Sequence, residues 1–119
     1  MHIDKDLVAA SATPLVLAIL ADGESYGYAI LKRVRALSAG ELQWTDGMLY
    51  PLLHRLCRLG YVTTEWRTPT DERRRRYYAI TDDGRAALVE QQKQWATVTR
   101  ALGDAWRGSG GLMTALGEV

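Results

Sequence analysis

The stretch TDGMLYPLLHRLCRLG, residues 45–60, restricts the fold of this chain more than any other part of the sequence. Thr45 is a good helix N-cap and Gly60 is a natural stop, so the stretch predicts one helix. Tyr50, His54 and Arg58 follow one another four residues apart and therefore share a polar face. The opposite face is predicted to be buried, because leucines recur along it at helical spacing: Leu49, Leu52, Leu53, Leu56 and Leu59.

Two further helices are predicted before this stretch. Apolar residues at helical spacing indicate a first helix over about 4–21, which Pro14 should kink or divide. YGYAILKRVRAL indicates a second helix, with Ser25 as its cap and an inward face made of Ile30, Leu31, Val34 and Leu37. A turn then leads into 45–60, which is the helix-turn-helix plan, in which the second helix enters the DNA major groove with its N-terminal part foremost.

The residues after Gly60 change from helical to strand-like composition. YVTTEW and RYYAIT are rich in β-branched and aromatic residues and predict an antiparallel hairpin over about 61–81, the wing of a winged helix. A helix through TDER competes with this interpretation, because TDER could form a capping box and Glu72 could pair with Arg76. The following YYAIT, closed by DDG, favours the strand.

Positive charge is concentrated in this region, although the whole chain has a net charge of only +1. Between His54 and Tyr77 there are seven arginines and three acidic residues, and four of the arginines are consecutive: Arg73, Arg74, Arg75 and Arg76. These four could be a solvated charge run that only confers solubility. Their place after a helix-turn-helix instead favours contact with nucleic acid, with Arg55 and Arg58 neutralising phosphate and Tyr50 and His54 contacting base edges or phosphate.

The last part of the sequence predicts a long helix and a tail. Leu88, Trp95 and Leu102 are seven residues apart with Val98 between them, a spacing that requires another helix to pack against. The predicted fold is therefore α+β and mainly α. It comprises a winged helix-turn-helix domain over 1–82, a C-terminal dimerisation helix over 83–107 and a flexible glycine-rich tail over 108–119.

Several classes of protein and site are disfavoured by the sequence. No apolar run is long enough to span a bilayer and the first residues lack a basic region, so the expected location is the cytoplasm, without membrane contact. His2, His54 and Cys57 make no plausible zinc set, and no catalytic set is visible, so we expect neither enzyme activity nor a metal or cofactor. Cys57 is predicted to be a small core residue or, alternatively, a redox-sensitive thiol. Asp82 and Asp83 are interpreted as capping residues.

Three segments, GYAILKRV, GMLYPLLHRLCRLGYV and RRRRYYAITDDGRAAL, resemble the PadR family of bacterial transcriptional regulators, and the resemblance extends from about Leu7 to Trp95. It implies a homodimeric repressor that binds a double-stranded, pseudo-palindromic operator. Met48 replaces the small hydroxyl residue that is frequent in the family. The predicted DNA-binding residues are Thr45, Gly47, Met48, Tyr50, Pro51, His54, Arg55, Arg58, Arg73, Arg74, Arg75 and Arg76.

The single short C-terminal helix is similar to that of the family's small subfamily, which includes a multidrug-sensing member from lactic acid bacteria. The resemblance implies release of DNA by a planar aromatic or hydrophobic effector, bound by Leu7, Ser11, Gln91, Gln92, Trp95, Val98 and Thr99. Alternatively, Trp95 could pack inside a dimer interface together with Leu88, Val98 and Leu102. The chain would then be a winged-helix module that binds nucleic acid or protein without sensing a small molecule.

Overall fold

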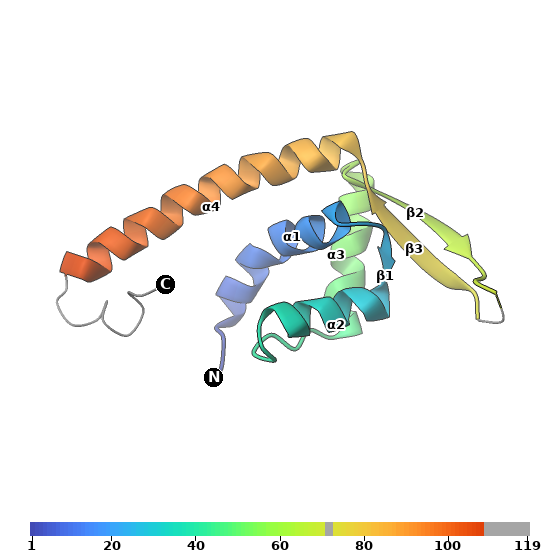
Figure 1. Ribbon diagram of the computed structural model, residues 1–119, viewed down its shortest axis with the longest axis horizontal. Helices are drawn as coiled ribbons and strands as arrows, with labels where there is room; N and C mark the ends of the chain where they lie inside the picture. The colour runs from blue at the N-terminus through green and yellow to red at the C-terminus, as the bar shows by residue number, and fades with distance from the viewer. Residues whose placement is uncertain (71–72, 109–119) are drawn as a thin grey trace. The chain divides into compact units, whose positions relative to one another are not determined.

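A computed structural model describes residues 1–70 and 73–108 of the chain (Figure 1). Its elements, in order, are α1 (Lys5–Ala21), β1 (Ser25–Tyr26), α2 (Gly27–Leu37), α3 (Asp46–Arg58), β2 (Val62–Arg67), β3 (Arg75–Ile80) and α4 (Asp82–Gly108). The fold is mainly helical with a small antiparallel sheet, which confirms the predicted α+β winged-helix class. Apart from Gly108, the predicted tail lies outside the described residues.

The chain divides into two compact units, Met1–Leu88 and Val89–Val119. The first unit contains α1 to α3, the sheet and the first turns of α4, and the second contains the rest of α4 as far as the structure describes it. The first unit reaches into α4 because Leu88 is buried in its hydrophobic core.

Helix α1 runs without interruption past Pro14, so the predicted division of this helix is wrong. Asp4 caps the helix by accepting a hydrogen bond of 2.8 Å from the Asp6 backbone N–H. Proline removes only one backbone hydrogen bond. We attribute the continuity of α1 to packing, because Val16, Leu17 and Leu20, just after the proline, are almost fully buried.

Helices α2 and α3 form the helix-turn-helix, and their ends differ from the prediction in three places. Ser25 does not cap α2, because it belongs to β1 and pairs with Tyr78, while Tyr26 occupies the N-cap position. Leu37 and Leu59, predicted to be buried, are 51% and 54% exposed, because each stands at the last turn of its helix, beyond the core. Thr45 does occupy the N-cap position of α3, although its side chain makes no capping bond in the described part of the chain.

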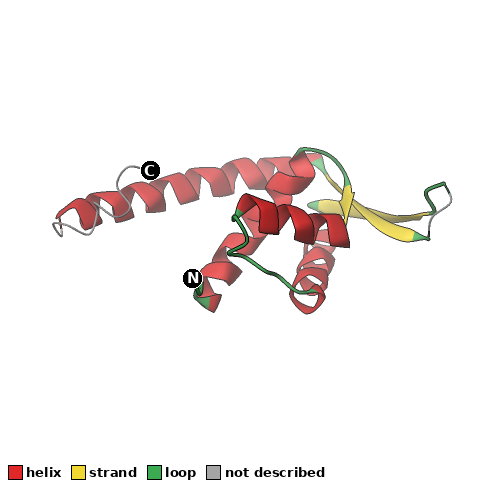
Figure 2. Ribbon diagram, turned by 60° about the horizontal axis from the view of Figure 1, so that its bottom comes forward, coloured by secondary structure: helices red, strands yellow, loops and turns green. Residues whose placement is uncertain are grey.

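The sheet has the strand order β1-β3-β2 and is antiparallel throughout. Strands β2 and β3 form the predicted hairpin, with Val62 opposite Ile80 at its base and Arg67 opposite Arg75 near its tip. The hairpin projects from the helices of the first unit as a two-stranded ribbon (Figure 2). Strand β1 was not predicted, because two residues are too few to show a period.

The start of α4 is fixed by a threonine. The Thr81 hydroxyl accepts a hydrogen bond of 3.0 Å from the Gly84 backbone N–H and donates one of 2.6 Å to the Gly60 carbonyl. Thr81 therefore caps α4, and the predicted capping role of Asp82 and Asp83 is wrong. Both acids instead lie in the first turn, where the positive end of the helix dipole favours them.

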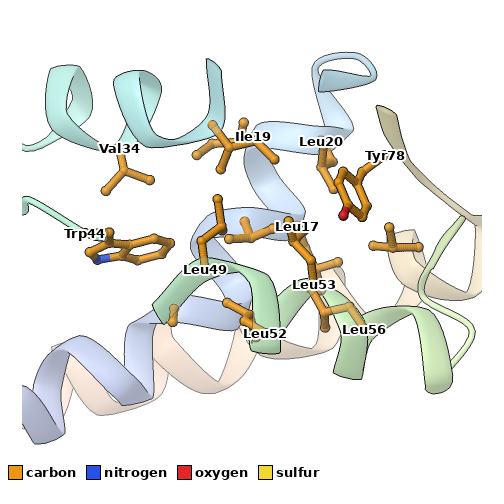
Figure 3. Close-up of a cluster of buried hydrophobic side chains, with 14 of the residues drawn as sticks. Leu17, Ile19, Leu20, Val34, Trp44, Leu49, Leu52, Leu53, Leu56 and Tyr78 are labelled. Carbon is orange, nitrogen blue, oxygen red and sulfur yellow. The ribbon is translucent and has the colours of Figure 1, made fainter. Parts of the chain in front are cut away.

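The core of the first unit lies where α1, α2, α3 and the sheet meet (Figure 3). Helix α3 supplies four of the five leucines that were predicted to be buried, namely Leu49, Leu52, Leu53 and Leu56. Tyr78 is 1% exposed and brings β3 into this core, whereas its neighbour Tyr77 is only half-buried. The core therefore fixes both α3 and the base of the hairpin in one rigid arrangement.

Candidate nucleic-acid interface

The polar face of α3 is exposed, as its spacing predicted. Tyr50, His54 and Arg58 all lie on this face, and Pro51 is exposed beside them. Pro51 is the sixth residue of the helix, so its lost backbone hydrogen bond falls close to the N-terminal end. Because the leucine face is buried, the polar face of α3 and its N-terminal end remain exposed and available to a partner.

A hollow of about 650 Å³ opens between the start of α2, the exposed face of α3 and the hairpin. It brings together six of the predicted DNA-binding residues, Tyr50, His54 and the four consecutive arginines. Residues that were not predicted complete it. The full lining is Tyr26, Gly27, Tyr28, Tyr50, His54, Trp66, Arg73, Arg74, Arg75, Arg76 and Tyr78. The hollow therefore combines aromatic rings with a high density of positive charge.

Three of the consecutive arginines lie over aromatic rings. The guanidinium carbon of Arg74 is 4.7 Å from the centre of the Trp66 ring, and that of Arg76 is 5.7 Å from the same ring. Arg75 lies over Tyr26 at 4.3 Å. Cations at such distances are attracted to the ring face, so each of these three side chains has an aromatic partner within the protein.

The opposite side of the hairpin carries an ion-pair cluster around Arg67. Its guanidinium bonds Glu24 through both terminal nitrogens, one of them at 2.8 Å from Glu24 Oε2, and it also bonds Glu65. The hydrogen bond from Arg67 lowers the pKa of the exposed Glu24 carboxyl. Arg67 also lies 4.9 Å from the centre of the Tyr77 ring. Because Glu24 precedes α2, the cluster links β2 to the helix-turn-helix.

Tyr50 lies against the start of α2, because Gly27 lacks a side chain. A Cβ atom at Gly27 would lie 2.2 Å from the Tyr50 hydroxyl oxygen, which no packing could accommodate without moving the tyrosine ring. Tyr50 remains 37% exposed. Gly27 thus sets the position of one side of the hollow.

The remaining predicted DNA-binding residues lie outside the lining of the hollow. Arg55 donates a hydrogen bond of 3.2 Å to the Thr13 hydroxyl on α1, and Met48 is half-buried against the core. Thr45, Gly47, Pro51 and Arg58 are exposed on or beside α3. Sequence reasoning missed Trp66, although a signal existed: the pairing of YVTTEW with RYYAIT places Trp66 opposite Arg76.

The predicted effector and dimer residues belong to both units of the chain. On α4, Trp95 is half-buried, Val98 is 49% exposed and Leu102 is 41% exposed. Gln91 is half-buried, and Gln92 and Thr99 are exposed. In the first unit, Leu7 is 53% exposed and Ser11 donates a hydrogen bond of 2.8 Å to the Leu7 carbonyl. Leu88 is 7% exposed because it already packs in the core of its own chain.

Within residues 1–70 and 73–108, no group of three or more histidine, cysteine or acidic side chains is placed to hold a metal ion. No helix in the same residues has the length and apolar character that crossing a membrane requires.

The chain is similar to known proteins over most of its length. The family model described as "Transcriptional regulator PadR-like family" matches residues 16–90. The chain is 36% identical over 87 residues to the transcriptional regulator Rv3488 of Mycobacterium tuberculosis, which covers 73% of this chain and 78% of that protein.

Solved structures share the fold. A transcriptional regulator from Clostridium thermocellum is 26% identical with a TM-score of 0.77, over 83% of this chain and 96% of that one. A PadR family transcriptional regulator from Eggerthella lenta is 31% identical with a TM-score of 0.71, over 84% of this chain and 85% of that one. The likeness therefore extends over most of the length of each protein.

Proposed function

Because the chain belongs to the PadR-like family of transcriptional regulators, we propose that it is a dimeric repressor that binds a pseudo-palindromic operator in the cytoplasm. The observation that carries this proposal is the hollow in which the exposed face of α3 and the four wing arginines meet. A helix face and a basic hairpin side by side match a DNA duplex, which offers a groove to the helix and phosphates to the hairpin.

The residues of this interface divide between two tasks. The wing arginines would bind phosphates or enter the minor groove, which fixes the position of the protein and makes affinity depend on salt. Tyr50 and His54 would contact base edges in the major groove and provide sequence preference. Arg58 would contact the adjacent phosphates, as would the other predicted residues at the front of α3, namely Thr45, Gly47, Met48 and Pro51.

A dimer is supported by the apolar face of α4. Trp95, Val98, Leu102 and Trp106 recur three or four residues apart, and the last three are 37% to 49% exposed in the single chain. Such a stripe on a helix is typically buried against a second helix. A palindromic operator would require the two recognition helices of such a dimer to lie about one DNA turn apart, ~34 Å.

Effector sensing is the finer part of the proposal. An indole at the dimer interface and its symmetry mate offer a slot for a planar aromatic molecule, and Trp95 is the residue of the stripe that would supply it. Leu7, Ser11, Gln91, Gln92, Val98 and Thr99 would complete that slot. An effector would release DNA only if it bound one dimer state better than another.

The deciding experiment is a band-shift titration of the dimer on its own upstream DNA across a series of salt concentrations. We expect a clear preference over random DNA and an affinity that falls steeply with salt. Arg74→Ala with Arg75→Ala should weaken binding to both DNAs and flatten the salt slope by ~2 to 4, at about 0.9 per lost phosphate contact. His54→Ala should instead reduce the preference for the operator.

The matched control is Arg85→Ala, which removes one exposed positive charge outside the hollow and should leave the slope nearly unchanged. Affinity that is independent of salt, or equal for operator and random DNA, would contradict operator recognition. If Arg74→Ala with Arg75→Ala changed only the solubility of the protein and not its DNA binding, the proposed role of the wing would be contradicted.

A further inference from the structure

Trp66 is a large aromatic side chain on the hairpin that the core does not explain. It is 51% exposed, near the tip of β2 and away from the buried end of the strand at Val62. Leaving half of an indole in water forfeits much of the free energy that its burial would provide. The exposed position of Trp66 therefore needs an explanation other than core packing.

The surroundings of Trp66 are cationic. Trp66 stands directly opposite Arg76 in the antiparallel register, and Arg74 lies two residues before Arg76 in the chain. Both guanidinium groups lie over the one indole, at 4.7 Å for Arg74 and 5.7 Å for Arg76. Arg76 is held further by a hydrogen bond of 2.9 Å from its Nε to the Thr64 hydroxyl.

The position of both guanidinium groups over the indole leaves phosphate binding possible. The N–H donors of a guanidinium lie in its plane, so a ring against its flat face does not consume them. Two positive groups side by side would repel each other, and free arginine side chains lose considerable rotamer entropy when a ligand immobilises them. An indole that attracts both groups reduces each of these costs before DNA arrives.

We propose that Trp66 is a positioning residue for DNA binding: its indole holds Arg74 and Arg76 in the hollow, where the N–H groups that Thr64 does not engage can donate to phosphate oxygens. The inference rests on the proposed function and adds to it a residue of β2. The competing explanation is that Trp66 only stabilises the hairpin. A structural role alone would change thermal stability without changing the number of phosphate contacts.

The test compares Trp66→Val with Trp66→Phe. Valine keeps the strand preference and removes the ring face, whereas phenylalanine retains a ring face. In the free protein, NMR of the arginine Nε–H groups should show that Trp66→Val abolishes the ring-current shifts of Arg74 and Arg76 and increases their mobility. On the upstream DNA, Trp66→Val should weaken binding about fivefold and flatten the salt slope, and Trp66→Phe should retain most of the affinity.

A double-mutant cycle separates positioning from stabilisation. In protein that already carries Arg74→Ala and Arg76→Ala, Trp66→Val should weaken binding no further, because the groups that the indole positions are gone. Circular dichroism and thermal unfolding of every variant check that the fold is retained.

Three outcomes would decide against the inference. Unchanged affinity and salt slope in Trp66→Val, with normal binding by the wild-type protein, would overturn it and leave the proposed function intact. The inference would also be overturned if Trp66→Val weakened DNA binding as much in the Arg74→Ala, Arg76→Ala protein as in the wild type. If the wild-type protein showed no salt-dependent binding, the proposed function would fall and this inference with it.

Discussion

At the scale of single residues, the four consecutive arginines are neighbours in the sequence but do not all share the same contacts in space. Side chains alternate between the two faces of a strand, so neighbours in the sequence are not neighbours in space. Arg74 and Arg76 share the ring of Trp66, whereas Arg75 lies over Tyr26. Three of the four arginines therefore form two groups, each placed over a different aromatic ring.

Cys57 allows a prediction at the same scale. It is half-buried on α3 against the core, and burial raises the pKa of its thiol, an effect that the nearby Arg76 only partly opposes. Since the thiolate is the reactive form, the pH profile of alkylation should shift to higher pH in the folded protein.

With iodoacetamide at pH 8, we expect Cys57 to react about tenfold more slowly in the native protein than in protein unfolded by guanidinium, as followed by mass spectrometry. The unfolded chain is the control, because it contains the same thiol without burial. Equal rates in the two states would contradict the interpretation of Cys57 as a core residue and favour a reactive thiol.

At the scale of elements, the junction between the hairpin and α4 depends on a close backbone approach. Thr81 caps the helix, and its hydroxyl donates a hydrogen bond to the Gly60 carbonyl. The Thr81 backbone N–H donates to the Tyr61 carbonyl at 3.0 Å. A Cβ atom at Gly84 would lie 2.1 Å from the Tyr61 carbonyl oxygen. Glycine is therefore required at position 84 for contact rather than for flexibility.

Gly84→Ala should destabilise the protein by about 1 to 3 kcal/mol, because α4 must move away from Tyr61 and its neighbours. The control is Gly103→Ala, also within α4, where an added Cβ meets only the end of the Arg107 side chain at 3.9 Å. That substitution should stabilise the helix by about 0.5 to 1 kcal/mol. Urea unfolding curves measure both changes, and a stabilised Gly84→Ala variant would show that the close approach is absent.

At the scale of the whole molecule, the proposed repressor requires two copies, which we propose pair through the apolar face of α4. The part of α4 beyond Leu88 belongs to a unit of its own, distinct from the unit whose core holds the helix-turn-helix. A substitution there can break a dimer without unfolding the first unit. This separation makes the oligomeric state testable independently of the DNA-binding fold.

Leu102→Glu should convert the dimer into a monomer, because a carboxylate would be buried in the apolar stripe. Sedimentation or light scattering should show half the mass, and operator affinity should fall at least tenfold, since only one half-site remains engaged. Thr97→Glu, five residues away on the other side of α4, introduces the same charge and should leave the dimer intact. A dimeric Leu102→Glu protein would place the interface elsewhere.

The proposed effector slot would also require the dimer, because Trp95 of each copy would form one of its walls. An acridine dye should quench tryptophan fluorescence of the wild-type protein, and Trp95→Leu should abolish most of the quenching while Trp106→Leu retains it. Equal quenching in the wild type and the Trp95→Leu variant would remove Trp95 from the site. No quenching at all would favour the alternative of a winged-helix module that senses no small molecule.

The sequence by itself determined the succession of the four helices and the hairpin, but not the short strand β1. Leucines at helical spacing identified α3, β-branched and aromatic residues identified the hairpin, and the order of the two predicted the winged helix. These signals are local, because hydrophobic period and end residues act within one element. Errors occurred where the outcome depended on neighbours in space: Pro14 inside α1, Leu37 and Leu59 beyond the core, and Ser25 drawn into β1 by pairing with Tyr78.

Only the tertiary structure decided which residues share the candidate site. Arg74 and Trp66 meet because two strands pair, and Tyr50 lies close to Gly27 because two helices pack. Arg55, which the sequence placed with the phosphate ligands, bonds Thr13 on α1 instead of entering the hollow. The physical reason is that periodicity fixes which face of an element a side chain occupies, whereas its partners follow from how the elements pack around the buried leucines.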